Sequence, residues 1–261
     1  MPSRVAALSC CAALVLLTIA VPARAWIENH VLGDDVRIEV DAAGKALVEH
    51  RITLKTTGSV RLKSYTITGV DRDAIVQSNS YVIPARDALS NSLDSATPVT
   101  MELRHPERPR RGGLVPEDST ADESPPPPAE LVVHVDGDRG LRRGSYVFVL
   151  RYRTDLRARG LIERDGSLVT IRWTGPFWDD GFDNARVLFV VPSAPTAPRA
   201  VGEAEAEGGT GDDPDNDQAV LLPRYLSEVR RAADADEVEL MRSYLPKGDA
   251  VSWAIRVDPR A

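Results

Sequence analysis

Cysteine is missing from most of this chain. Its two cysteines, Cys10 and Cys11, lie within the first 25 residues, which have the features of a segment removed from the mature protein. A mature chain without cysteine forms no disulfide and no thiolate metal site. Its stability must therefore come from apolar burial and backbone pairing. Cys10 also precedes most of the apolar run, which argues against a lipid-attachment cysteine.

Lysine and clustered positive charge are scarce. The 261 residues include 39 acidic and 32 basic side chains, so the formal net charge is −7. Removal of residues 1–25 takes away two arginines and no acid, which changes the net charge to −9. Phosphate groups are bound by clustered Lys and Arg. We therefore expect neither nucleic acid nor an anionic lipid surface as a partner.

Only one long apolar run is present. Arg4 precedes Ala6–Val21, which is almost wholly apolar, and Ala23-Arg24-Ala25 ends the segment in a small-x-small pattern. This arrangement predicts a signal peptide over residues 1–25, because the run is shorter than the roughly 20 residues that span a bilayer. We expect a periplasmic or secreted protein that is not stably inserted in a membrane after cleavage.

The motifs of common enzymes are also missing. The sequence contains no G-x-S-x-G nucleophile elbow, no H-E-x-x-H zinc helix, no phosphate loop and no dinucleotide glycine pattern. We therefore predict a protein that is not an enzyme and that has no cofactor and no metal site.

What the chain does have is period-two alternation of apolar and polar residues. Val36, Ile38 and Val40 alternate with charged residues, and after a short turn at 41–45 a second run alternates in the same way, with Ala46, Val48, His50, Ile52 and Leu54 on one face. These two runs predict an antiparallel hairpin with one face in water.

Similar runs recur along residues 26–261. Asp165-Gly166 marks a two-residue hairpin turn, and Val187–Val191 is apolar on both faces, as in a central strand. Further strands are expected near 62–70, 74–83, 99–103, 131–135, 146–152, 168–173, 238–244 and 251–257. Helical periodicity is weak and confined to 225–233. The pattern predicts an all-β fold, an antiparallel β-sandwich with long flexible loops, as one domain over 26–261.

Two segments are predicted to be loops of this sandwich. Residues 104–130 are rich in proline, and residues 202–218 are rich in Gly, Asp and Glu. Neither composition supports a packed core, so we expect a disordered Pro-rich insertion and a flexible acidic loop. Polyproline segments bind partners at low entropic cost, so docking through the first loop, or through strand edges, is an open alternative to a tolerated insertion.

Three sets of polar residues have some features of a catalytic or metal-binding site. His50 lies on an apolar strand face and is expected to be a buried, hydrogen-bonded core residue. His134 and Asp136 share a strand face, but a zinc site needs further ligands, so a solvent-facing pair is favoured. The aspartates at 213, 215 and 217 have calcium-loop spacing, but Gln218 and Arg224 replace the glycine and the glutamate that such a loop requires.

The most distinctive stretch is WTGPFWDDGFD at 173–183. Its aromatic and carboxylate side chains suggest a speculative ligand site at Trp173, Trp178, Asp179, Asp180 and Asp183. Exposed aromatics with aspartates stack on and hydrogen-bond sugars, and two suitably spaced carboxylates equip a glycosidase. The structural alternative, which we favour, is that the aromatics close one end of the sandwich while the aspartates cap turns.

The mature start and two later segments resemble a known family. Val36–Val40, the turn at 41–45 and Val48-Glu49 on the next strand are similar to the opening of domain of unknown function 2207. Trp173, Gly175 and Trp178, and the segment 245–257, resemble its later motifs. The resemblance implies an exported N-terminal β-domain of bacterial membrane proteins, here without the transmembrane part, and implies no activity or catalytic residues.

Together these patterns favour an exported, non-enzymatic β-sandwich of the bacterial cell envelope that binds an envelope protein or a surface polymer. The alternative is a carbohydrate-binding module or glycan-active enzyme that uses the 173–183 stretch.

Tryptophan fluorescence titrated with envelope glycans tests the alternative. Stacking on Trp178 would change the emission, and Trp178→Ala would abolish the change without unfolding the protein. A response that survives this substitution would contradict a glycan site at Trp178.

Overall fold

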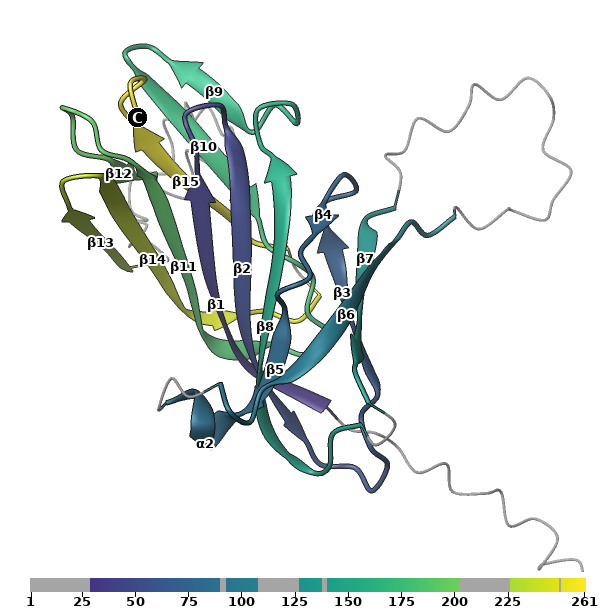
Figure 1. The fold of residues 1–261 in the computed structure, drawn as a ribbon. Helices are drawn as coiled ribbons and strands as arrows, with labels where there is room; N and C mark the ends of the chain where they lie inside the picture. Colours follow the sequence, from purple (N-terminus) through teal and green to yellow (C-terminus); the bar gives the residue numbers. More distant parts are fainter. Residues whose placement is uncertain (1–28, 90–92, 108–126, 138–139, 202–225, 249) are drawn as a thin grey trace, which may run out of the picture.

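A computed structural model of the chain describes residues 29–89, 93–107, 127–137, 140–201, 226–248 and 250–261 (Figure 1). The predicted signal peptide (1–25), the centre of the predicted Pro-rich insertion (104–130) and the predicted acidic loop (202–218) lie outside these residues. Most of the described residues lie in strands, and the helix among them, α2 (Ala85–Ala88), has one turn. The prediction of an all-β fold is confirmed.

A large sheet of eleven strands forms most of the protein. Ten follow one another in space, and β4 (Ile75–Val76) pairs with β8 beside this path. In spatial order they are β13 (Leu226–Arg231), β14 (Ala235–Leu245), β11 (Phe182–Pro192), β1 (Asn29–Val40), β2 (Lys45–Thr56), β8 (Gly144–Asp155), β5 (Tyr81–Pro84), β6 (Thr97–Arg104), β7 (Ala129–Val135) and β3 (Ser64–Val70).

A smaller antiparallel sheet covers one side of the large one. It consists of β12 (Arg199–Ala200), β15 (Ser252–Val257), β10 (Leu168–Thr174) and β9 (Ile162–Asp165), in that order. A two-residue turn joins β9 to β10 one residue later than the predicted Asp165-Gly166: Asp165 still pairs with Leu168, so the turn is Gly166-Ser167, and Gly166 has the positive φ of 60° that such a turn favours.

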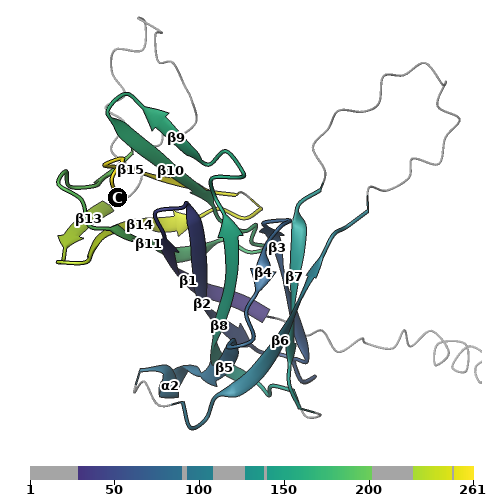
Figure 2. The same ribbon diagram turned by 45° about the horizontal axis from the view of Figure 1, so that its top comes forward.

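The large sheet changes direction between β5 and β6. Figures 1 and 2 show β3, β6 and β7 turned away from β1, β2 and β8. Tyr65 of β3 meets Phe148 of β8, with ring centroids 6.1 Å apart, so this arm packs against the same face that the small sheet covers. That inner face holds the core, and the opposite face, called the outer face below, points to solvent.

The hairpin of β1 and β2 forms as its alternation predicts. Ile38, Val48 and Ile52 are fully buried, and the two strands pair antiparallel from Val40 and Ala46 outward. The turn is held by Asp41, whose Oδ1 accepts hydrogen bonds from the backbone N–H groups of Ala43 and Lys45, both at 2.9 Å. Short-range alternation was thus sufficient to predict this element.

Two sequence expectations need correction. The sheets were expected to be antiparallel throughout, but β1 and β11 pair in parallel, because the chain crosses through β9 and β10 before it returns. The weak helical periodicity at 225–233 does not correspond to a helix, since Leu226–Arg231 forms the strand β13. Its arginines are paired with β14 carboxylates, Arg230 with Glu239 and Arg231 with Asp236, an arrangement between strands that a one-dimensional pattern does not reveal.

The bulge at Gly69 provides a test of the junction between β3 and the segment after β10. Gly69 has φ +98°, and a Cβ there would overlap the ring of Phe177, whose N–H donates to the Thr68 carbonyl at 2.7 Å. Gly137 has nearly the same φ, +101°, with no atom near a Cβ.

We expect Gly69→Ala to lower the free energy of unfolding by about 1–3 kcal/mol more than Gly137→Ala, because only Gly69→Ala adds steric overlap to the left-handed backbone cost. Urea denaturation of both variants measures the difference. Equal losses would mean that the Phe177 contact does not constrain the fold.

Candidate functional site

The structure turns both tryptophans of the 173–183 stretch inward. Trp173 is 2% and Trp178 3% exposed, and the Trp178 ring packs edge-on against Phe182 with ring centroids 5.6 Å apart. A sugar stacks on an open ring face, which neither tryptophan offers in this arrangement. The geometry agrees with the packing interpretation of these aromatics, while ligand binding at the stretch stays a prediction.

The three aspartates of the stretch lie nearer the surface. Asp179 and Asp183 are exposed, and the Asp180 carboxylate lies 3.6 Å from the His30 ring of β1. Burial raises the pKa of Tyr65 well above its usual value, and nearby carboxylates, including those of Asp179 and Asp180, raise it further. The Tyr65 phenol therefore stays protonated. Asp180 thus lies beside β1, Asp179 and Asp180 lie near Tyr65 of β3, and Asp183 lies on β11 opposite Tyr244 of β14.

A line of polar side chains crosses the core beneath this stretch. His50 is 1% exposed, as expected from its place on an apolar face, and its Nδ1 lies 2.9 Å from Asp34 Oδ2. Its Nε2 lies 3.3 Å from the hydroxyl of Tyr152, which in turn accepts a hydrogen bond from the Trp173 indole. Burial, and then the carboxylates of Asp71 and Asp34, raise the pKa of Tyr152 well above its usual value.

The directions of these hydrogen bonds indicate that the four side chains, Trp173, Tyr152, His50 and Asp34, have a structural role. An indole N–H only donates, so the Tyr152 O–H is free to donate to His50, and the His50 Nδ1–H then donates to Asp34. Every group is satisfied, and the four side chains join β10, β8, β2 and β1. Because all four are nearly fully buried, no substrate reaches them in this structure.

The expected polar pair of β7 lies at the surface. His134 Nε2 is 3.7 Å from Glu102 Oε2, and Asp136 accepts a hydrogen bond from Thr100 at 2.9 Å. Within the described ranges, no group of three His, Cys, Asp or Glu side chains is placed to hold a metal ion. The aspartates of the predicted calcium-type spacing fall outside those ranges.

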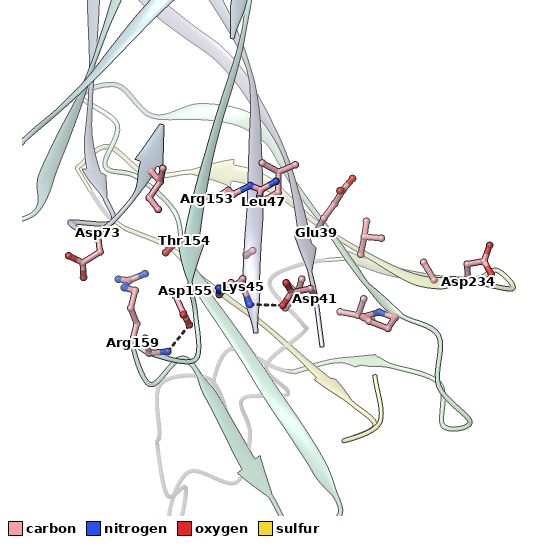
Figure 3. A pocket seen from close by; sticks show the side chains of 18 residues that line it. Glu39, Asp41, Lys45, Leu47, Asp73, Arg153, Thr154, Asp155, Arg159 and Asp234 are labelled. Carbon is pink, nitrogen blue, oxygen red and sulfur yellow. Dashed lines mark hydrogen bonds between the residues drawn. The ribbon is translucent and has the colours of Figure 1, made fainter. Parts of the chain in front are cut away.

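A cleft of about 750 Å³ lies on the outer face, where β1, β8 and β11 end and β2 begins (Figure 3). Apolar side chains from three strands form its floor: Leu47, Ile75 and Val190. Ile75 is 66% exposed, which is unusual for an isoleucine and leaves an apolar surface open to a ligand. Arg153 lies beside Leu47, its partner in the register of β2 and β8.

Carboxylates dominate the rim of this cleft, which we call the acidic cleft. Five of them line it against three cationic side chains; the acids are Glu39, Asp41, Asp73, Asp155 and Asp234, and the bases Lys45, Arg153 and Arg159. Two of these charges are already paired outside the cleft, Arg159 with the buried Asp71 and Glu39 with Arg37. Asp73 and Asp234 lie on opposite sides of the cleft in Figure 3, and both are exposed.

Sequence reasoning missed the acidic cleft. Its residues come from six strands and the turns beside them, so no motif joins them. One signal was available, because Leu47 occupies an alternating position that in Lys45, Glu49 and Arg51 holds a charged residue on the solvent-facing side of β2. An apolar residue at a solvent-facing strand position marks either an edge or a contact surface.

Comparisons with known proteins give little further guidance. No protein-family model and no curated protein matches the sequence. A solved structure described as a candidate protease from Parabacteroides distasonis has 14% identity and a TM-score of 0.42, over 87% of this chain and 40% of that one. An M1 zinc metallopeptidase from Deinococcus radiodurans has 12% identity and a TM-score of 0.41, over 90% and 43%.

The chain thus spans about two fifths of the length of these two proteins. TM-scores this low support no statement on its fold or activity. In the described part of the chain, no helix has the length and apolar character needed to cross a bilayer.

The buried His50–Asp34 pair and the half-exposed His30–Asp180 pair are expected to contribute unequally to stability. Asp34→Ala leaves the buried Nδ1–H of His50 without its acceptor, so we expect the free energy of unfolding to fall by about 1–3 kcal/mol. Asp180→Ala removes the partner of the half-exposed His30, and we expect a loss below about 1 kcal/mol. Urea denaturation at neutral pH measures both. Similar losses would show that the buried pair contributes no more than a surface pair.

Proposed function

We propose that this chain is an exported, non-enzymatic β-domain of the bacterial cell envelope that binds a polypeptide partner in the acidic cleft. The observation that carries the proposal is the cleft itself, which combines an open apolar floor with a rim of excess carboxylates. Such a surface on an acidic chain attracts a partner that is cationic where it enters the cleft.

A polypeptide fits this cleft better than a simple cation does. Arg153 lies over the floor and has no hydrogen-bond or ion-pair partner among the described residues, so its N–H groups are available to backbone carbonyls of a ligand. The apolar floor at Leu47 and Ile75 accepts apolar side chains, while Asp73 and Asp234 pair with cationic ones. An extended chain presents all three kinds of group.

Export and the envelope location rest on the sequence. The signal peptide predicted over residues 1–25 supports export, and the resemblance to the exported β-domain of domain of unknown function 2207 supports a place in the bacterial envelope. The missing enzyme motifs support a binding role. A β-domain with an open cleft is consistent with each of these expectations.

The carbohydrate alternative has less support than polypeptide binding. Trp173 and Trp178 pack in the core, so Trp178→Ala would remove a buried ring as well as any sugar contact. A loss of fluorescence response would then have two explanations. Asp183→Lys is a cleaner probe of this stretch, because Asp183 is exposed and leaves the core intact when it is replaced.

Site-specific crosslinking tests the proposal. A photoreactive benzoylphenylalanine at position 75, in the floor of the acidic cleft, is compared with one at position 60, where Val60 is 41% exposed outside the cleft. In the native envelope we expect a polypeptide adduct from position 75 and none from position 60, identified by mass spectrometry. Reversing the rim charge with Asp73→Lys and Asp234→Lys should lower the adduct yield about tenfold, and Asp183→Lys should leave it unchanged.

Two results would contradict the proposal. A glycan adduct at position 75 would reassign the cleft to a surface polymer. An adduct whose yield does not respond to the reversed rim charges would show that the carboxylates do not recognise the partner.

A further inference from the structure

A second cleft lies on the same outer face. It measures about 560 Å³ and lies between β5, β8 and the short helix α2. Most of its lining residues are apolar: the buried Ile83 and Val149 and the half-buried Val147 from the sheet, and the exposed Leu89 and Leu93 at its border. Leu89 is 89% and Leu93 60% exposed, so this apolar cleft has two unburied leucines at its border.

Strand register places the two clefts on one line. Leu47 pairs with Arg153 in the acidic cleft, and Thr53 pairs with Val147 in the apolar cleft. Leu47 and Thr53 are six residues apart on β2, an even number, so their side chains point to the same face. Six residues of strand span about 20 Å.

The surface between the clefts is fixed by ion pairs. Arg151 Nε donates to Glu49 Oε2 at 2.6 Å, and Arg151 Nη1 donates to the Asn79 carbonyl at 2.7 Å. The same guanidinium lies 5.8 Å from the ring centroid of Tyr81, which also lines the apolar cleft. Glu49, Arg151 and the Asn79 carbonyl are hydrogen-bonded to one another. This group of residues therefore separates the two clefts and leaves no third binding site between them.

We propose that both clefts hold a single extended polypeptide segment of the partner, with cationic residues in the acidic cleft and apolar residues in the apolar cleft. This inference rests on the proposed function and adds the sequence pattern of the ligand. Alternate side chains of an extended segment point toward the protein. The cationic and the apolar residues of the ligand are therefore six residues apart, the same spacing as between Leu47 and Thr53 on β2.

Charge and chemistry select this occupant. The acidic cleft has an excess of carboxylates, and the apolar cleft is bordered by Asp35 and Arg51, whose charges balance. A uniformly cationic segment would leave the leucines exposed, and a uniformly apolar one would leave the exposed Asp73 and Asp234 unpaired. A segment with both characters satisfies each cleft.

Fluorescence anisotropy with synthetic peptides tests the inference on the full mature chain. The probe is a nonapeptide with lysine at its first and third positions, leucine at its seventh and ninth, and serine or threonine elsewhere. A second peptide has serine in place of both leucines, and a third has the same composition with lysines and leucines adjacent. We expect the first to bind about tenfold more tightly than the other two.

Protein variants separate the two clefts. Leu89→Ser with Leu93→Ser should weaken the first peptide about tenfold and leave the serine-substituted peptide unchanged. Asp73→Lys with Asp234→Lys should weaken both peptides. Val60→Ser replaces an exposed apolar residue outside both clefts and should change neither affinity.

The results distinguish this inference from the proposed function. If the leucine variant binds the first peptide as the unaltered chain does, or if the adjacent arrangement binds equally well, the two-cleft segment is wrong while the acidic cleft stands. If the charge-reversed variant also binds normally, or no peptide binds, both proposals fail. Sedimentation that shows a dimer lost on Leu89→Ser with Leu93→Ser would assign the apolar cleft to a second copy and overturn the inference.

Discussion

The pairing of β2 with its two neighbours is the constraint on which the rest of the structure depends. β2 is bonded along all of its twelve residues to β8 and over nearly the same length to β1. Because side chains alternate strictly along a strand, this pairing assigns every residue of three strands to one face or the other. A slip of one residue would turn His50 and its apolar neighbours to solvent and bring Glu49 and Arg51 into the core.

The polar line through the core reinforces that register. His50 reaches Asp34 on one side and Tyr152 on the other only when the three strands are aligned as observed. An apolar core tolerates small shifts, since its contacts are not directional, whereas a hydrogen-bonded line across four strands does not. The line therefore contributes specificity of alignment to a sheet whose apolar residues, mostly Val, Ile and Leu, are similar to one another.

Local pattern was enough to predict most strands and the burial of His50, because alternation over five or more residues is a property of the segment itself. The parallel pairing of β1 with β11, the strand at 226–231 and the acidic cleft were not predictable in this way. Each depends on contacts between segments far apart in the chain. The tryptophans of the 173–183 stretch illustrate the same limit, because a cluster of aromatics has the same composition whether it faces a ligand or the core.

The parallel pair also bears on how the protein reaches its folded state. Asp35 and Arg186, which are partners in that pair, are about 150 residues apart in the chain, so the hairpin of β1 and β2 is complete long before its second neighbour is synthesised. Contacts closed over such long loops form slowly. During that interval β1 has an unpaired backbone edge and one apolar face, the features that favour misassociation between chains. Folding of this protein is therefore expected to be limited by the arrival of β11, and a chaperone that shields the hairpin edge would act at that step.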